Sequence, residues 1–449
     1  MPGPVGELRT PIRAWVVVFA GTAVNLCLGI LYAWSIWKAN LVGSTEHPAG
    51  TAMGGLNEGW VYLTDAQATW AYAICGITFA IFMIPGGLLQ DKMGPRLGAT
   101  LGGLFLGCGC ILAGLGHSYG ALIAGFGVLG GIGMGLGYAA ATPAAVKWFG
   151  PHRRGLVAGL VVGGYGAAAI YISPTARYLI ANYGISGSFI ALGIFFAIVI
   201  VTAAQLLANP GSEYRPRSSG TAPADTTSSM TTRQWSARAM VHTWQFYAML
   251  FLFIASAQSG LLVIANAAPI LNQTAQGVGF LAANAWLLAS FGGMVNASGR
   301  VGTGLYSDKL GRRRAYLING LAAVAGLLLT PTIMRSGSAP LLFLAVGVAY
   351  WQYGGGLALM PAMTADYFGS KDLGIKYGLV FLGWGIAFLI PQLAGYIRDM
   401  TGTLDSAFYL SGLLMLSAVV LSRAMQRPAD APIAADSSAL PSSAPLSSG

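Results

Sequence analysis

Long apolar segments alternate with short polar ones along the chain, from about residue 14 to residue 424. Most of the apolar segments run for about 20 residues, the length that a helix needs to cross the hydrocarbon core of a bilayer. We therefore predict twelve transmembrane helices, at about 14–37, 66–90, 97–117, 119–148, 155–180, 186–208, 244–270, 279–306, 315–334, 340–368, 377–397 and 406–424.

Two longer polar segments set the predicted domain organisation. Residues 209–243 are rich in Ser, Thr, Pro and Arg, which predicts a flexible cytoplasmic linker. Residues 425–449 consist largely of Ala, Pro and Ser, which predicts a disordered cytoplasmic tail. The chain is thus expected to form an N-terminal six-helix bundle over 13–208 and a C-terminal six-helix bundle over 244–424.

The composition agrees with this pattern and excludes an ordinary soluble enzyme. Charged residues make up 8% of the chain and the mean hydropathy is +0.64, whereas soluble domains average about 25% charged residues. Glycine accounts for 64 of 449 residues, which suits helices that pack closely in a membrane. Strands of a β-barrel would instead alternate apolar and polar residues. We expect an all-α integral membrane protein.

The net charge of +10 is explained by topology and not by nucleic-acid binding. Of the 24 Lys and Arg residues, four lie in the odd-numbered loops, one lies deep in a predicted span, and the other 19 lie at the termini, in the linker and in the even-numbered loops. The positive-inside rule then predicts a multi-pass protein of the cytoplasmic (inner) membrane with both termini in the cytoplasm. The four residues of the odd-numbered loops are Lys38, Arg177, Arg335 and Arg398.

The two halves of the chain contain the same loop after their second span. The first copy has Asp91 and the second has Asp308, 217 positions later, and both follow the pattern Gly-x-x-x-Asp-Lys-x-Gly-x-Arg. A parallel repeat of six spans places the substrate site between the halves, near the middle of the membrane. We assign these loops to conformational coupling between the bundles, with residues Gly87, Asp91, Lys92, Arg96, Gly304, Asp308, Lys309 and Arg312.

With six spans in each half and one such loop per half, the chain resembles the major facilitator superfamily from Arg13 to Arg423. The resemblance implies alternating access by two six-helix bundles. Transport would then need no ATP hydrolysis, and the sequence has no Walker-type loop.

Arg300 is the most unusual charge in the sequence. It lies eight residues before Asp308, which places it about 12 Å along the helix and near the middle of the bilayer. Burying an arginine there costs at least about 2.5 kcal/mol, its span has no acidic partner, and Asn296 lies one turn away. A planar guanidinium matches a carboxylate with two parallel hydrogen bonds. We therefore predict that Arg300 binds an anionic substrate, with a structural arginine bonded to helix carbonyls as the alternative.

Aromatic residues at mid-span are the next candidates, because a tyrosine hydroxyl can donate to a carboxylate while its ring excludes water. Packing between helices is the alternative for each of them. The predicted substrate-binding set is Arg300, Asn296, Tyr32, Trp34, Tyr138, Tyr165, Tyr353 and Trp384. Tyr165 and Trp384 occupy equivalent positions of the repeat, 219 residues apart, so we expect both at the cavity. Two glycine ladders, at 127, 131 and 135 and at 155, 159 and 163, predict close helix packing.

Several stretches resemble the oxalate/formate antiporter family and its monocarboxylate-transporter relatives. They include Leu31-Tyr32-Ala-Trp34-Ser, Lys147-Trp148-Phe149, Gly164-Tyr165-Gly166 and Ser307-Asp308-Lys309-Leu-Gly311-Arg312. The resemblance implies that Arg300 is the substrate arginine and that Tyr32, Tyr138 and Tyr165 line the cavity.

Two departures from these relatives affect the expected substrate. The oxalate exchanger has a second cation in its eleventh span, where this chain has Trp384, which favours a monoanion. Monocarboxylate relatives have an Asp where this chain has Asn296, so proton coupling through an Asp–Arg pair is not expected.

The leading hypothesis is a secondary transporter, and not an enzyme, for a small carboxylate such as formate, lactate, pyruvate or acetate. Uniport, proton symport and anion exchange all remain open, and so do an oxalate/formate-type exchanger and a non-transporting receptor. The cysteines lie in apolar segments and the histidines are scattered, so we expect no metal and no cofactor. The expected partners are the carboxylate, a proton as candidate coupling ion, and the lipid bilayer, with the monomer as the functional unit.

Overall fold

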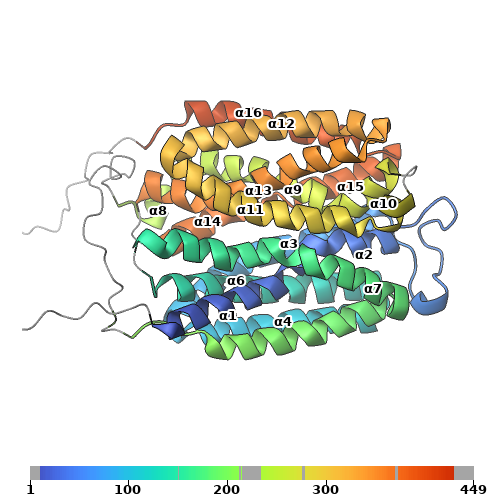
Figure 1. The fold of residues 1–449 in the computed structure, drawn as a ribbon, viewed down its shortest axis with the longest axis horizontal. Coiled ribbons are helices and arrows are strands. Elements are labelled where there is room, and N and C mark those ends of the chain that lie inside the picture. Colours follow the sequence, from blue (N-terminus) through green and yellow to red (C-terminus); the bar gives the residue numbers. More distant parts are fainter. Residues whose placement is uncertain are drawn as a thin grey trace, which may run out of the picture.

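In the computed structural model, the apolar segments are helices that run side by side along the longest axis of the molecule (Figure 1). The structure describes residues 11–149, 151–211, 214, 234–275, 279–369 and 373–428. Most of the predicted linker and tail lies outside these residues. The helices are α1 (Ile12–Leu28), α2 (Trp34–Leu41), α3 (Asp65–Met93), α4 (Pro95–Leu115), α5 (Tyr119–Leu122), α6 (Gly131–Val146), α7 (Pro151–Leu206), α8 (Ala237–Met240), α9 (Trp244–Thr274), α10 (Gly279–Ala283), α11 (Trp286–Leu310), α12 (Arg312–Ser336), α13 (Ala339–Phe368), α14 (Leu373–Ile386), α15 (Leu389–Thr401) and α16 (Asp405–Ala424).

These helices form twelve membrane crossings in the described part of the chain. Ten helical segments are long and apolar enough to cross a membrane. One of them is α7, which makes two crossings because the backbone reverses at Gly184, where φ is 71°. The remaining crossing, the eighth along the chain, is α11, which contains Arg300 and is less apolar than the others. The predicted all-α membrane fold is confirmed, as two six-helix bundles.

Three crossings depart from a regular α-helix. The first changes to a 3-10 helix, η1, over Gly29–Ala33, and the fourth contains a π-helix, η3, over Ile123–Gly130. The eleventh breaks between α14 and α15, just before Pro391, which cannot donate a hydrogen bond to the carbonyl of Ala387. Such breaks allow side chains to leave the regular helix pattern near a site.

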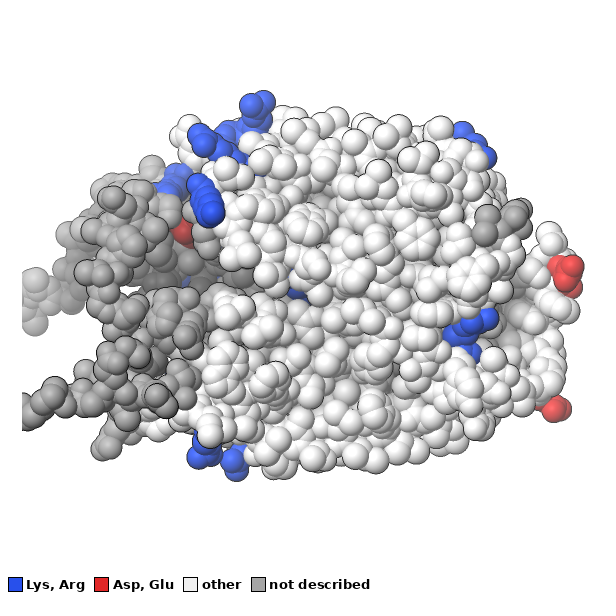
Figure 2. All heavy atoms as spheres, in the orientation of Figure 1, with Lys and Arg blue, Asp and Glu red and all other residues white. Residues whose placement is uncertain are grey.

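The two halves of the chain lie next to each other, with α1 to α7 on one side and α9 to α16 on the other (Figure 1). They meet where α7 packs on α11 and where α3 packs on α14 and α15. We call the end of the molecule that carries the 42–64 segment the loop end. The described ends of the chain lie at the opposite end (Figure 1). On the face that Figure 2 shows, charged atoms gather near the two ends and the surface between them is nearly free of charge, as expected for a surface that faces lipid.

One of the two predicted glycine ladders packs tightly. A Cβ at Gly131 would lie 2.6 Å from the carbonyl oxygen of Cys75, and one at Gly135 would lie 2.8 Å from that of Phe79. These glycines therefore bring α6 against the backbone of α3. The fifth-span ladder differs, because a Cβ at Gly163 would meet no atom within 4 Å.

The segment between α2 and α3 is folded onto the first half of the chain. Its Trp60 indole donates to the hydroxyl of Ser186 at 2.8 Å, and its Asn57 side chain accepts from the backbone of Ile185 at 2.7 Å. Both partners follow the reversal at Gly184. The segment is thus attached to the turn between the fifth and sixth crossings.

Candidate functional site

Arg300 lies on α11 and is 4% exposed. Among the described residues its guanidinium makes three hydrogen bonds: Nε to Asn296 Oδ1 at 3.2 Å, Nη1 to the carbonyl oxygen of Val162 at 2.9 Å, and Nη2 to the hydroxyl of Tyr32 at 3.0 Å. Asn296 belongs to the same helix, whereas Val162 and Tyr32 belong to the first half of the chain. Arg300 therefore connects the two halves, and these three partners are all uncharged.

Two glycines make this arrangement possible. A Cβ at Gly29, at the start of η1, would lie 2.5 Å from the carbonyl oxygen of Tyr165, so only glycine lets the first crossing approach α7 here. A Cβ at Gly166 would lie 3.3 Å from Nε of Arg300 and 3.3 Å from Cα of Ala297. Gly166 thus leaves the space that the guanidinium occupies.

A row of hydrogen bonds continues from Arg300 through two tyrosines to a tryptophan. The hydroxyls of Tyr32 and Tyr353 are 2.7 Å apart, and the indole Nε1 of Trp384 donates to the Tyr353 oxygen at 2.8 Å. All three side chains are at most 1% exposed. The row joins η1, α11, α13 and α14 near the middle of the molecule.

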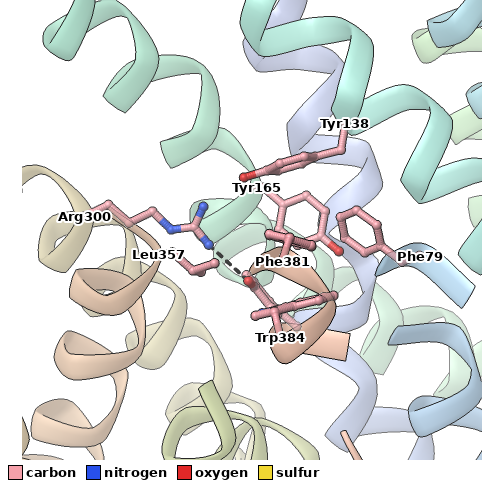
Figure 3. A pocket seen from close by; sticks show the side chains of 8 residues that line it. Phe79, Tyr138, Tyr165, Arg300, Leu357, Phe381 and Trp384 are labelled. Carbon is pink, nitrogen blue, oxygen red and sulfur yellow. Dashed lines mark hydrogen bonds between the residues drawn. The ribbon is translucent and has the colours of Figure 1, made fainter. Parts of the chain in front are cut away.

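A small cavity lies against this row. Figure 3 shows the Arg300 guanidinium pointing toward it, with Tyr138 and Tyr165 nearby. The space open to the centre of a water molecule is about 10 Å³, close to the least that holds one water. An organic ligand would need more room, so the lining side chains or the bundles would have to move before one could bind here. The lining residues are Tyr32, Phe79, Tyr138, Tyr165, Arg300, Leu357, Phe381 and Trp384.

The structure brings together seven of the eight residues of the predicted substrate-binding set. Tyr165 and Trp384, the equivalent pair of the repeat, both line the cavity. Asn296 and Tyr353 do not line it, but each is hydrogen-bonded to a residue that does. Trp34 lies elsewhere: its indole stacks on Phe126 with ring centroids 4.7 Å apart, inside the first half of the chain. A role for Trp34 in substrate binding thus has no geometric support.

Four groups near Arg300 were missed by sequence analysis. Phe79, Leu357 and Phe381 form an apolar side of the cavity, and nothing distinguishes Phe79 and Leu357 in sequence from other buried apolar residues. The fourth is the carbonyl of Val162, a backbone group that has no sequence signal. Phe381 alone could have been inferred, because it lies one helical turn before Trp384.

The two repeated loops share a backbone turn. Gly94 links α3 to α4 with φ 86°, and Gly311 links α11 to α12 with φ 87°, a conformation that favours glycine. Asp91 and Lys92 end α3, and Nε of Arg96 donates to the carbonyl of Leu207 at 3.0 Å. In the second copy, Lys309 lies in the last turn of α11, and Arg312 begins α12 and donates to Ser307. Gly87 and Gly304 both face open space, and the side chain of Asp308 lies outside the described atoms.

Replacing Asp91 by Asn should slow transport without weakening substrate binding. Its carboxylate lies 3.8 Å from the ammonium of Lys147, at the ends of α3 and α6 and away from the cavity, and the two side chains are 71% and 43% exposed. An exposed pair contributes up to about 1 kcal/mol, so we expect a rate decrease of up to about fivefold. Transport rate and equilibrium binding should be measured side by side, with Glu58→Gln at the loop end as the control. A loss of affinity at unchanged rate would contradict the assignment.

Comparisons with known proteins agree with this architecture. The model of the Major Facilitator Superfamily matches residues 14–353 and 303–447. The uncharacterized MFS-type transporter YhjX of Escherichia coli is 26% identical over 375 residues, which cover 83% of this chain and 85% of YhjX. The oxalate:formate antiporter of Oxalobacter formigenes is 26% identical over 412 residues, covering 87% and 91% of the two chains.

Two further relatives come from eukaryotes. Apicoplast pyruvate carrier 1 of Toxoplasma gondii is 25% identical, with 85% of this chain and 84% of the carrier covered. Monocarboxylate transporter 12 of Rattus norvegicus is also 25% identical, with 79% and 76% covered. Because the family match spans nearly the whole sequence and the helices form two six-helix bundles, this chain belongs to the major facilitator superfamily.

Proposed function

We propose that this protein is a secondary transporter that moves a small monocarboxylate, such as formate, lactate, pyruvate or acetate, across the cytoplasmic membrane by alternating access. The observation that carries the proposal is that hydrogen-bond donors outnumber hydrogen-bond acceptors among the side chains around Arg300. Relatives named as an oxalate:formate antiporter, a pyruvate carrier and a monocarboxylate transporter support a small carboxylate.

The donors and acceptors can be counted along the row of hydrogen bonds that leads from Arg300 to Trp384. Four groups in it can donate: Nη2 of Arg300, Nε1 of Trp384 and the hydroxyls of Tyr32 and Tyr353. They make three hydrogen bonds, and the two tyrosine oxygens are the acceptors. One hydroxyl hydrogen is therefore left over within the row. Beside it, the buried Nδ2 of Asn296 has no hydrogen-bond partner among the described residues.

Such a site suits a ligand that brings only acceptors. An ionised carboxylate has two oxygens that accept about four hydrogen bonds and donate none. Tyr165 adds a further hydroxyl, which now donates only to the sulfur of Met134 at 3.7 Å, a weak acceptor. The aromatic and aliphatic wall formed by Phe79, Leu357 and Phe381 suits a short carbon chain.

The number of charges favours a monoanion. Arg300 is the one cation among the residues that line the cavity. Lys38 is paired with Asp65, and Lys376 donates to the carbonyls of Phe368 and Gly369. A dianion would leave one buried negative charge uncompensated, which is costly.

Replacing Trp384 by Lys should raise the affinity for oxalate relative to lactate. The new ammonium would point into the same cavity as Arg300 and supply the second positive charge that a dianion needs. Competition by oxalate and by lactate against a labelled monocarboxylate measures the effect at fixed pH. Trp384→Met, which removes the ring but adds no charge, is the matched control. Wild-type protein that binds oxalate at least as tightly as any monocarboxylate would refute the single-charge argument.

Reconstituted vesicles provide the test of the proposed function. Purified protein should bind one or more C1–C4 monocarboxylates in a thermal-shift screen, and the same compound should show counterflow in vesicles. Binding without counterflow would instead favour a receptor. Uptake that occurs only when the opposite face also carries a carboxylate would identify an exchanger, whereas net uptake that acidifies the lumen would identify proton symport.

A further inference from the structure

A group of buried charges lies at the loop end, far from the cavity. Lys38 on α2 is fully buried, and Asp65, the first residue of α3, is 2% exposed. The Lys38 ammonium donates to Oδ1 of Asp65 at 2.7 Å and to Oδ1 of Asn266 at 2.6 Å. A buried ion pair of this kind needs further partners for its remaining donors and acceptors.

Those partners come from the other half of the chain. Arg398 on α15 donates from Nη1 to Oδ2 of Asp65 at 2.6 Å. The neighbouring Asp399 accepts the backbone N–H groups of Asp65 and Ala66, at 3.0 Å and 2.9 Å. These N–H groups begin α3, where a carboxylate is favourable. Two consecutive residues of α15 thus bind both the first side chain and the first backbone groups of α3.

The contacts cross the boundary between the halves in both directions. Lys38 of the first half reaches Asn266 of the second, while Arg398 and Asp399 of the second half reach the start of α3. A glycine permits the approach, since a Cβ at Gly395 would lie 3.1 Å from Cα of Ala66. We call Lys38, Asp65, Asn266, Arg398 and Asp399 the loop-end latch.

The latch is arranged so that it can open without leaving a buried charge alone. If the halves separate at this end, Asp65 loses Arg398 but keeps Lys38, because both belong to the first half. The side chain of Arg398 is already 31% exposed, so water can replace its partner. Removing one partner from a fully buried pair is otherwise strongly destabilising.

We propose that the loop-end latch holds this end of the transporter closed, and that its opening gives access to the cavity from that side of the membrane. The proposal rests on the alternating access proposed above, but not on the identity of the substrate. Arg398, Asp399 and Asn266 are the latch residues of the second half, and they set how often this end opens, because their contacts with the first half must break.

Accessibility of a cysteine at the bundle interface tests the proposal. Thr69 is fully buried one turn after Asp65, and its Oγ1 lies 3.2 Å from where a Cβ of residue 395 would be. Thr69→Cys would be introduced after replacing the four native cysteines. A thiol reagent that cannot cross the membrane is applied to each face of vesicles in turn, without any substrate. Arg398→Gln should raise labelling from the loop-end face about tenfold, since a charge-assisted hydrogen bond is lost.

Arg335→Gln is the matched control, because its partner Asp405 belongs to the same half of the chain. Labelling that is unchanged in Arg398→Gln, or raised equally in Arg335→Gln, overturns the proposal. If Arg398→Gln does not reach the membrane, Asp399→Asn is measured by the same criterion. Because no substrate is present, failure of carboxylate transport leaves this test unaffected.

Discussion

Uptake of a labelled monocarboxylate should fall at least about 100-fold when Arg300 is replaced by Lys, although the positive charge is kept. Lysine cannot hold Asn296, Val162 and Tyr32 at once and still present two parallel donors to a carboxylate. Each charge-assisted hydrogen bond contributes about 1.5–3 kcal/mol, so the loss of two accounts for the decrease. Arg300→Ala should remove uptake altogether. Initial uptake rates, normalised to the amount of protein in the membrane, measure both effects.

Arg335→Lys is the control for the Arg300 substitutions. Arg335 is exposed at the loop end and pairs with Asp405 of the same half of the chain, so the same chemical change there should leave uptake nearly unchanged. Normal uptake by Arg300→Ala would show that Arg300 is not the carboxylate anchor.

A single added methyl group, in Gly166→Ala, should weaken the apparent affinity for substrate about tenfold. The new Cβ would lie 3.3 Å from Nε of Arg300 and from Cα of Ala297, so the guanidinium or the contact between α7 and α11 must shift. A shift of about 1 Å in a positioning group can cost much of the binding or rate that depends on it. The half-saturating substrate concentration should rise more than the maximal rate falls.

Gly163→Ala provides a control on the same helix, because a Cβ at that position would meet no atom within 4 Å. It should transport at nearly the wild-type rate. Equal effects of the two substitutions would mean that glycine content of the helix matters, and not the space beside Arg300.

The fold could be predicted from the sequence because the length of an apolar run determines whether a helix spans a bilayer. Departures from a regular α-helix inside a span were less predictable, as in the first span, predicted at 14–37, where a 3-10 helix covers Gly29–Ala33. Arg300 could be found because a charge deep in an apolar run has few explanations. The contacts between the bundles could not, since Asp65 and Arg398 are 333 positions apart and only the folded chain brings them together. Trp34 shows the converse, because an aromatic residue at mid-span has the same sequence signal whether it faces a cavity or a neighbouring helix.

The uncharged partners of Arg300 also have an electrical consequence. With Asn296, Val162 and Tyr32 as its hydrogen-bond partners, the guanidinium carries one uncompensated positive charge at mid-membrane, and a bound monoanion cancels it. Reorientation of the loaded carrier would then move no net charge, whereas reorientation of the empty carrier would move one positive charge through part of the membrane field, at up to about 2.3 kcal/mol per 100 mV. One-for-one exchange of monoanions would be insensitive to voltage, and the return of the empty carrier would be the step that a membrane potential accelerates or slows.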